Sequence, residues 1–98
     1  MNVTTTENRV TLHRNMEEDV RITVYNTIDE QGKLMYDCTV TVGRSSSHKM
    51  IYDYNELYAW VIDTWRYQVG VAPSRFALDT LESRMLADPK IMLEVSHA

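Results

Sequence analysis

Apolar and polar residues alternate along most of the first half of the chain. Within residues 9–43 the apolar residues alternate with polar ones in three stretches, which is the period of a strand that buries one face. Three strands are predicted in this way, one beginning at Val10 and Leu12 and two over residues 20–28 and 34–42. Val, Ile, Thr and Tyr, which suit a pleated surface, dominate them. We expect an antiparallel meander with one apolar face and one threonine-rich face.

Short polar segments separate these strands. Residues 15–19 and 29–33 are polar and turn-like, and Gly32 supplies the positive φ that a tight hairpin needs. After a loop over residues 43–47, a short run over residues 48–52 is a further candidate strand before the pattern changes.

From Asp53 onward the apolar residues follow a helical period. A helix is predicted over residues 53–69, with Asp53 or Asn55 as its N-cap and Gly70 as its C-cap. A second helix is predicted over residues 74–87, between a Pro-Ser start signal and an Asp-Pro stop signal. The apolar arcs of the two helices comprise Tyr54, Leu57, Tyr58, Val61, Ile62, Trp65 and Val69, then Ala77, Leu78, Leu81 and Met85.

The predicted elements combine into one α+β domain over residues 1–98. Alternation over residues 91–95 predicts a last strand that returns to the sheet. The expected order is β-β-β-(β)-α-α-β, with a three- to five-stranded, mainly antiparallel sheet and two helices packed on one of its faces. Residues 1–7 and 96–98 are expected to be frayed.

The balance of charge limits the classes of partner. Ten Lys and Arg residues against fourteen Asp and Glu residues give a net charge of −4, whereas proteins that bind phosphate backbones generally run basic. From Asp53 onward seven acidic residues stand against four basic ones, so the acidic excess lies mainly on the helices. No apolar run approaches the roughly 20 residues of a membrane span, and a signal peptide is not evident. We expect a cytoplasmic protein that binds neither membranes nor nucleic acid.

Motifs that carry chemistry are absent from the sequence. Cys38 is the only cysteine, which excludes an intramolecular disulfide and a zinc site with paired thiolates, and its place in an alternating run predicts a buried packing role. A P-loop, a G-x-S-x-G elbow and the metal-binding spacings of His and Cys are all missing. We expect no cofactor, no metal and no catalysis.

The strongest candidate contact surface is a stripe on the first predicted helix. Glu56, Trp60, Asp63 and Tyr67 recur at i, i+4, i+7 and i+11, pointing away from the apolar arc, and Phe76 of the second helix could join them. Trp and Tyr often supply most of the binding energy of a protein interface, and the acids favour a partner with a basic surface. The alternative is that the second helix covers Trp60 and makes it part of the core.

Two other surfaces remain open as ligand-binding or catalytic sites. His13 and Asp37 are expected on the threonine-rich face, where they could share a hydroxyl group for acid–base chemistry. Arg44 and Lys49 flank a serine run in the predicted loop and form a weak candidate anion site. The residues expected on the threonine-rich face are Thr11, His13, Arg21, Thr23, Tyr25, Asp37, Thr39 and Thr41.

These features lead to a non-catalytic function through a protein–protein interface. We expect an inhibitor, adaptor or regulatory subunit of a larger enzyme or complex, as is typical of small phage or mobile-element proteins that block host enzymes. The alternatives are a small ligand-binding or catalytic domain and a self-assembling structural subunit. An exposed edge strand also allows a homodimer with a continuous sheet.

Overall fold

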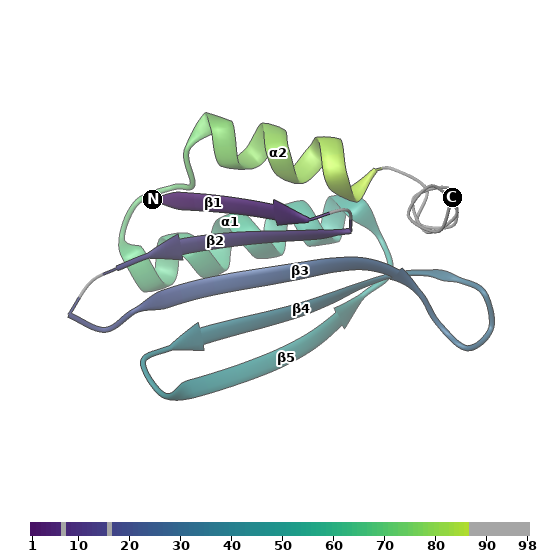
Figure 1. The fold of residues 1–98 in the computed structure, drawn as a ribbon, viewed down its shortest axis with the longest axis horizontal. Helices are drawn as coiled ribbons and strands as arrows, with labels where there is room; N and C mark the ends of the chain where they lie inside the picture. The colour runs from purple at the N-terminus through teal and green to yellow at the C-terminus, as the bar shows by residue number, and fades with distance from the viewer. Residues whose placement is uncertain (7, 16, 87–98) are drawn as a thin grey trace.

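Five strands followed by two helices form the described part of the protein (Figure 1). The computed structural model describes residues 1–6, 8–15 and 17–86. The elements are β1 (Asn2–Thr6), β2 (Arg9–Arg14), β3 (Val20–Ile28), β4 (Leu34–Val42), β5 (Ser45–Ile51), α1 (Tyr54–Val69) and α2 (Arg75–Met85). All neighbouring strands are antiparallel and the order is β1-β2-β3-β4-β5, which confirms the predicted α+β class with five strands. The strand predicted over residues 91–95 lies outside the described residues.

Two strands differ from the sequence prediction. Residues 1–7 are expected to be frayed, but residues 2–6 form β1 and pair with β2 from Asn2↔His13 to Thr6↔Arg9. β5 begins at Ser45, where the sequence predicts a loop. Gly43 has a φ of 60° and begins a two-residue turn between the paired residues Val42 and Ser45, as in a type II′ hairpin.

The predicted turn and caps are confirmed by their hydrogen bonds. The Asp29 carboxylate accepts backbone N–H bonds from Gln31 and Lys33, both at 2.9 Å, in the β3–β4 turn. Asp53 caps α1 by accepting from the Glu56 N–H at 3.0 Å. Gly32 in this turn and Gly70 at the end of α1 have the positive φ that their predicted roles require. Ser74 caps α2 by accepting from the Ala77 N–H.

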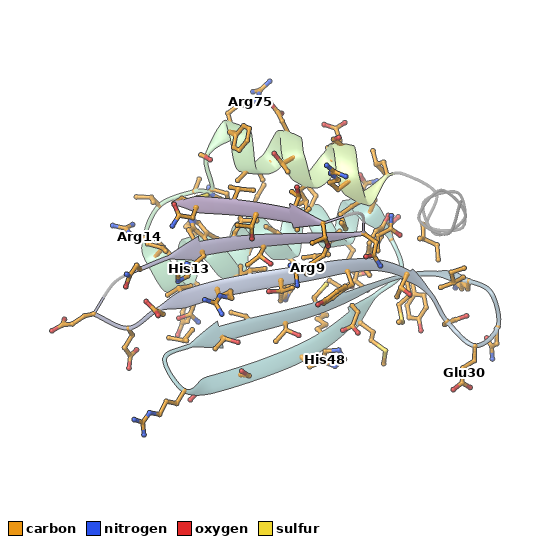
Figure 2. The ribbon with its side chains drawn as sticks, in the orientation of Figure 1. Arg9, His13, Arg14, Glu30, His48 and Arg75 are labelled. Carbon is orange, nitrogen blue, oxygen red and sulfur yellow. The ribbon has the colours of Figure 1, made fainter. Side chains whose placement is uncertain are left out.

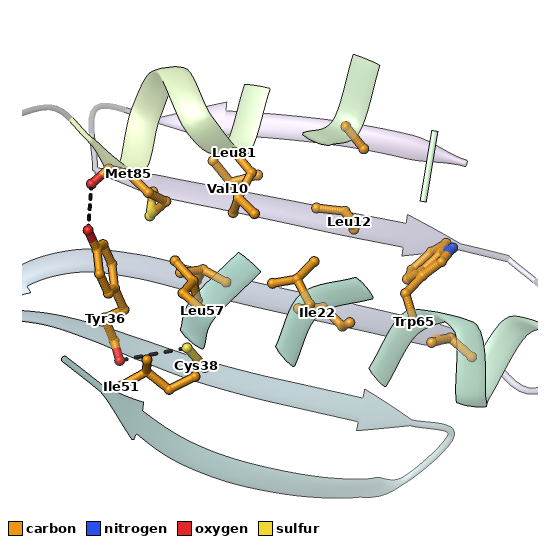
Figure 3. Close-up of a cluster of buried hydrophobic side chains, with 14 residues drawn as sticks. Val10, Leu12, Ile22, Tyr36, Cys38, Ile51, Leu57, Trp65, Leu81 and Met85 are labelled. Atoms are coloured by element: carbon orange, nitrogen blue, oxygen red, sulfur yellow. Dashed lines mark hydrogen bonds between the residues drawn. The ribbon is translucent and has the colours of Figure 1, made fainter. Parts of the chain in front are cut away.

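Both helices cover the same face of the sheet and enclose the core (Figure 3). α1 contacts β3 and β5, whereas α2 contacts β2 and β3. The buried apolar residues are Val10, Leu12, Val20, Ile22, Val24, Tyr36, Cys38, Ile51, Leu57, Val61, Trp65, Ala77, Leu81 and Met85. The alternation of the strands and the arcs of the helices therefore predict most of this core.

Two polar side chains of the sheet fasten the end of α2. Asn26 is fully buried on β3, and its amide donates to the carbonyl oxygens of Arg84 at 3.3 Å and Met85 at 3.1 Å. The Tyr36 hydroxyl on β4 also donates to the Met85 carbonyl, at 3.1 Å. The last carbonyls of a helix have no donor within the helix, so these bonds satisfy them and fix α2 against the sheet.

Candidate ligand-binding face of the sheet

The sheet face opposite the helices carries ordered rows of polar side chains. Strand pairing aligns Thr4, Thr11, Thr23 and Thr39 across β1 to β4. Because side chains alternate between faces, the neighbouring rows on this face lie two residues away along each strand. One of them contains Arg9 beside Tyr25, and the other contains His13 beside Arg21.

A hollow of about 690 Å³ lies over β1, β2 and β3 on this face and reaches around the β1 edge to Ser74 and Phe76 at the start of α2. Thr4, Thr11 and Thr23 contribute hydroxyl-bearing side chains to its lining, and Thr11 is almost fully buried. Arg9 and His13 lie at different positions along β2, as Figure 2 shows. The volume falls within the range of about 300–1,000 Å³ that is typical of sites for small molecules.

Polar atoms in this hollow lack partners among residues 1–6, 8–15 and 17–86. Arg9 Nε and His13 Nε2 are shielded from solvent, and no described residue forms a hydrogen bond with either. His13 Nε2 lies 3.9 Å from the Asp19 carboxylate, which is too far for a hydrogen bond. Leaving a buried donor unsatisfied costs about 1–3 kcal/mol.

Arg21 adds a second guanidinium to the same hollow. It is exposed, and it forms no ion pair with any residue of the described ranges. Pairing places Arg9 opposite Tyr25 and Arg21 opposite His13, so the two arginines are four positions apart along β3. That separation is about 14 Å along the strand. The hollow therefore offers cationic groups near both of its ends.

The structure does not form the expected acid–base pair of His13 and Asp37. The two residues are two strands and four residues apart in register, roughly 17 Å between their Cα positions. Asp37 instead contacts His48 on β5, and both of these side chains are partly exposed. The alternation correctly predicts a shared face, but the register separates the two groups along it.

The helix stripe is only partly assembled as expected. Glu56 and Asp63 are exposed, Tyr67 is 85% exposed, and Trp60 is partly buried against the core. Trp60 therefore packs against the core with part of its side chain and exposes the rest. It is neither a fully exposed contact residue nor a core residue. Phe76, in contrast, lines a groove beside β1.

The two flanks of α1 have different surroundings. Burial, and next the Glu82 carboxylate of α2, raise the pKa of Tyr54 to about 12, so this flank of α1 faces α2. Trp60 lies about 120° around the helix from Tyr54, at 100° per residue, and so occupies the flank away from α2. Phe76 is on the β1 side of α2, and the structure does not bring it together with Tyr67.

The two cations of the candidate anion loop are also separated. Arg44 belongs to the two-residue turn after β4, whereas Lys49 is in β5 with four strand residues between them. Lys49 is paired with Cys38, which places it on the helix-facing side of the sheet. The anion site expected at residues 43–49 depends on a loop, and this segment is mostly strand.

Cys38 has the packing role that its position predicts. Its side chain is fully buried, and burial, followed by the nearby Asp37 charge, raises the pKa of the thiol to about 12. The thiol therefore stays protonated at neutral pH and is a poor nucleophile.

Within the described ranges, no three His, Cys, Asp or Glu side chains are grouped to hold a metal ion. No helix in these ranges is both long and apolar enough to cross a membrane.

Arg9 and Thr4 are the site residues that the sequence analysis misses. Arg9 directly precedes the buried Val10, so extending the alternation by one residue would have placed it on the open face. Thr4 belongs to a strand without an alternating apolar signal.

No protein-family model, curated protein or solved structure matches the chain.

Proposed function

We propose that this chain is a non-catalytic binding protein, and that the open face of its sheet takes a small anionic ligand with a flat ring. The observation that carries this proposal is the hollow itself, in which Arg9, Arg21 and His13 are gathered around a row of threonines. A guanidinium group recognises phosphate or carboxylate through paired hydrogen bonds.

The other groups in the hollow suit the remainder of such a ligand. Tyr25, 39% exposed, presents a ring next to Arg9, and Phe76 adds an apolar ring near β1. Threonine hydroxyls between the cations can donate or accept hydrogen bonds. A nucleotide combines a ring with anionic groups and matches this set of side chains.

Charge around the face favours a compact ligand over a long polyanion. Glu17, Glu18 and Asp19 lie in the loop before β3, and Asp29 and Glu30 follow its end. A polyanion running along the strands would meet these acids, and the whole chain carries a net charge of −4. A ligand confined to the hollow meets fewer of these acids than a long polyanion would, with Asp19 beside His13 at the wall of the hollow.

Titration with ADP, pyrophosphate and adenosine tests this proposal. We expect ADP to bind most tightly, and Arg9→Ala and Arg21→Ala each to weaken it about tenfold or more, because each removes a charge-assisted contact. Isothermal titration calorimetry measures the affinities, and circular dichroism checks the fold. Arg66→Ala is the matched control, since Arg66 is an exposed arginine on α1. If neither ADP nor pyrophosphate binds below about 1 mM, or if all three variants bind alike, the proposal fails.

A protein interface on α1 is the second candidate function. Tyr67 is 85% exposed on the flank that also carries Glu56, Asp63 and the exposed part of Trp60. So large an exposed aromatic beside acids favours a protein partner with a basic surface. This is the inhibitor, adaptor or regulatory function that the sequence predicts.

Affinity capture with matched variants tests the second candidate. We expect the wild-type chain to retain a stoichiometric protein and Tyr67→Ala to retain at least tenfold less, because the exposed ring is the anchor. Tyr52→Ala is the control, since Tyr52 is an exposed tyrosine outside α1. Equal retention by Tyr67→Ala and the wild type would exclude this flank, and loss in Arg9→Ala alone would assign the partner to the sheet.

A further inference from the structure

Among residues 1–6, 8–15 and 17–86, β1 forms an edge of the sheet, and it lacks the features that usually keep an edge from pairing. Its sequence, Asn2–Thr6, contains no charged residue and no proline, and it pairs with β2 residue by residue without a bulge. Four of its five residues are β-branched, which favours extended pairing. Natural edge strands are commonly protected by charge, proline or a bulge.

The opposite edge of the sheet has such protection. β5 carries Lys49 on its helix-facing side, and this side chain is exposed. An inward-pointing lysine disfavours the addition of another strand, because the addition would tend to bury the charge. Of the two edges in the described part of the sheet, β1 is therefore the one suited to pairing.

We propose that a second copy of this chain pairs antiparallel along β1, about a two-fold axis at Thr4. Antiparallel overlap of all five residues places Thr4 opposite the partner's Thr4, and Val3 opposite the partner's Thr5. Threonine pairs are favourable across antiparallel strands, and no charge is buried in this register. The surface is self-complementary, as a two-fold interface requires.

The helix layer supports the same arrangement. A groove of about 380 Å³ lies beside β1, and its lining joins the strand to α2 through Val3, Thr5, Phe76, Asp79, Thr80, Ser83 and Arg84. Phe76 is 69% exposed there, so burying its ring against a second copy would remove apolar surface from water. α2 runs alongside β1 in the same direction (Figure 1), so the two copies of α2 would be antiparallel.

The spacing of the strands lets Phe76 bridge the two copies. α2 packs over β2, and the two copies of β2 would be three strand spacings apart, about 14 Å. A helix with its side chains is roughly 10–12 Å across, so a narrow space remains between the helices. Phe76 from each copy would fill this space over the groove of the other. The row of Thr4, Thr11, Thr23 and Thr39 would then continue from one sheet into the other. The ligand hollows of the two copies would lie on either side of the two-fold axis.

A charge-exchange experiment tests the dimer. Analytical ultracentrifugation of the full chain is expected to give twice the 11.4 kDa mass of one chain. Thr4→Lys and Thr4→Glu should each sediment as single chains, because they place like charges opposite each other at the axis. An equimolar mixture of the two variants should recover the dimer, since the unlike charges then face each other.

Controls separate the interface from the fold and from ligand binding. Ser47→Lys places the same charge on the exposed β5 edge and should leave the dimer intact. Phe76→Asp should weaken the dimer through α2 without altering the strand. Arg9→Ala should leave the mass unchanged even if it abolishes ADP binding, so each proposal can fail separately. A wild-type chain that sediments alone, or Thr4 variants that stay dimeric, would overturn the inference.

Discussion

Replacing Trp65 with alanine is expected to lower the free energy of unfolding by about 3–5 kcal/mol, as truncating a buried aromatic side chain does. Trp65 is fully buried on α1 and heads the set of largest buried side chains. Figure 3 shows it at one end of the core, close to the sheet. The small core leaves few neighbours that can move into so large a cavity. The total free energy of unfolding of a small domain is about 5–15 kcal/mol, so this one substitution would remove a large part of it.

Urea denaturation followed by circular dichroism measures this effect. Trp65→Phe is the matched control, because it keeps an aromatic ring and removes the indole N–H, for which the described residues provide no partner. We expect this conservative variant to cost less than half as much as alanine. A loss below about 1 kcal/mol for Trp65→Ala would show that the buried indole does not stabilise the core as its burial indicates.

Replacing Asn26 with leucine is expected to cost about 2–3 kcal/mol and to loosen the end of α2 in particular. The change removes donors to the Arg84 and Met85 carbonyls at a fully buried position. The cost of leaving such acceptors unsatisfied is about 1–3 kcal/mol, to which the strain of the bulkier side chain adds.

Amide hydrogen exchange distinguishes this local effect from general destabilisation. Backbone amides in the last turns of α2 should exchange faster in Asn26→Leu relative to those of α1. Tyr36→Phe is the graded control, because it removes only the single bond from the hydroxyl to Met85 and should cost about 1 kcal/mol. If amide exchange became faster by the same factor in both helices, Asn26 would not hold the end of α2 in particular.

The sequence predicts the elements whose local pattern is strong. Alternation identifies β3 and β4, and the arc around Val61 and Trp65 identifies the buried side of α1. That helix begins after Asp53, its N-cap, and ends at Gly70, its left-handed C-cap, as the sequence predicts. β1 is missed because its threonines lack apolar alternation, and its strand depends on pairing with β2. Tertiary pairing, rather than local preference, decides such segments.

Site geometry depends on relations between elements that no local pattern contains. Alternation assigns His13 and Asp37 to the same face, but their separation follows from strand register. Helical spacing groups Trp60 with Tyr67, whereas the position of Phe76 depends on which flank of α2 lies toward β1. Arg21 falls in a predicted strand, whereas Arg9 lies one residue before the first predicted strand. Their shared hollow follows from how β1, β2 and β3 pack side by side.

The consecutive order of the strands has a consequence for how the chain emerges during synthesis. Each strand pairs with its neighbour in sequence, so hairpins can close over short loops before α1 and α2 exist. The apolar side of the sheet would then be uncovered until about the last third of the described chain has left the ribosome. Such a transient surface promotes aggregation. Asn26 and its carbonyl acceptors are 58 and 59 residues apart, so these bonds between the two layers cannot form until the end of α2 has been synthesised.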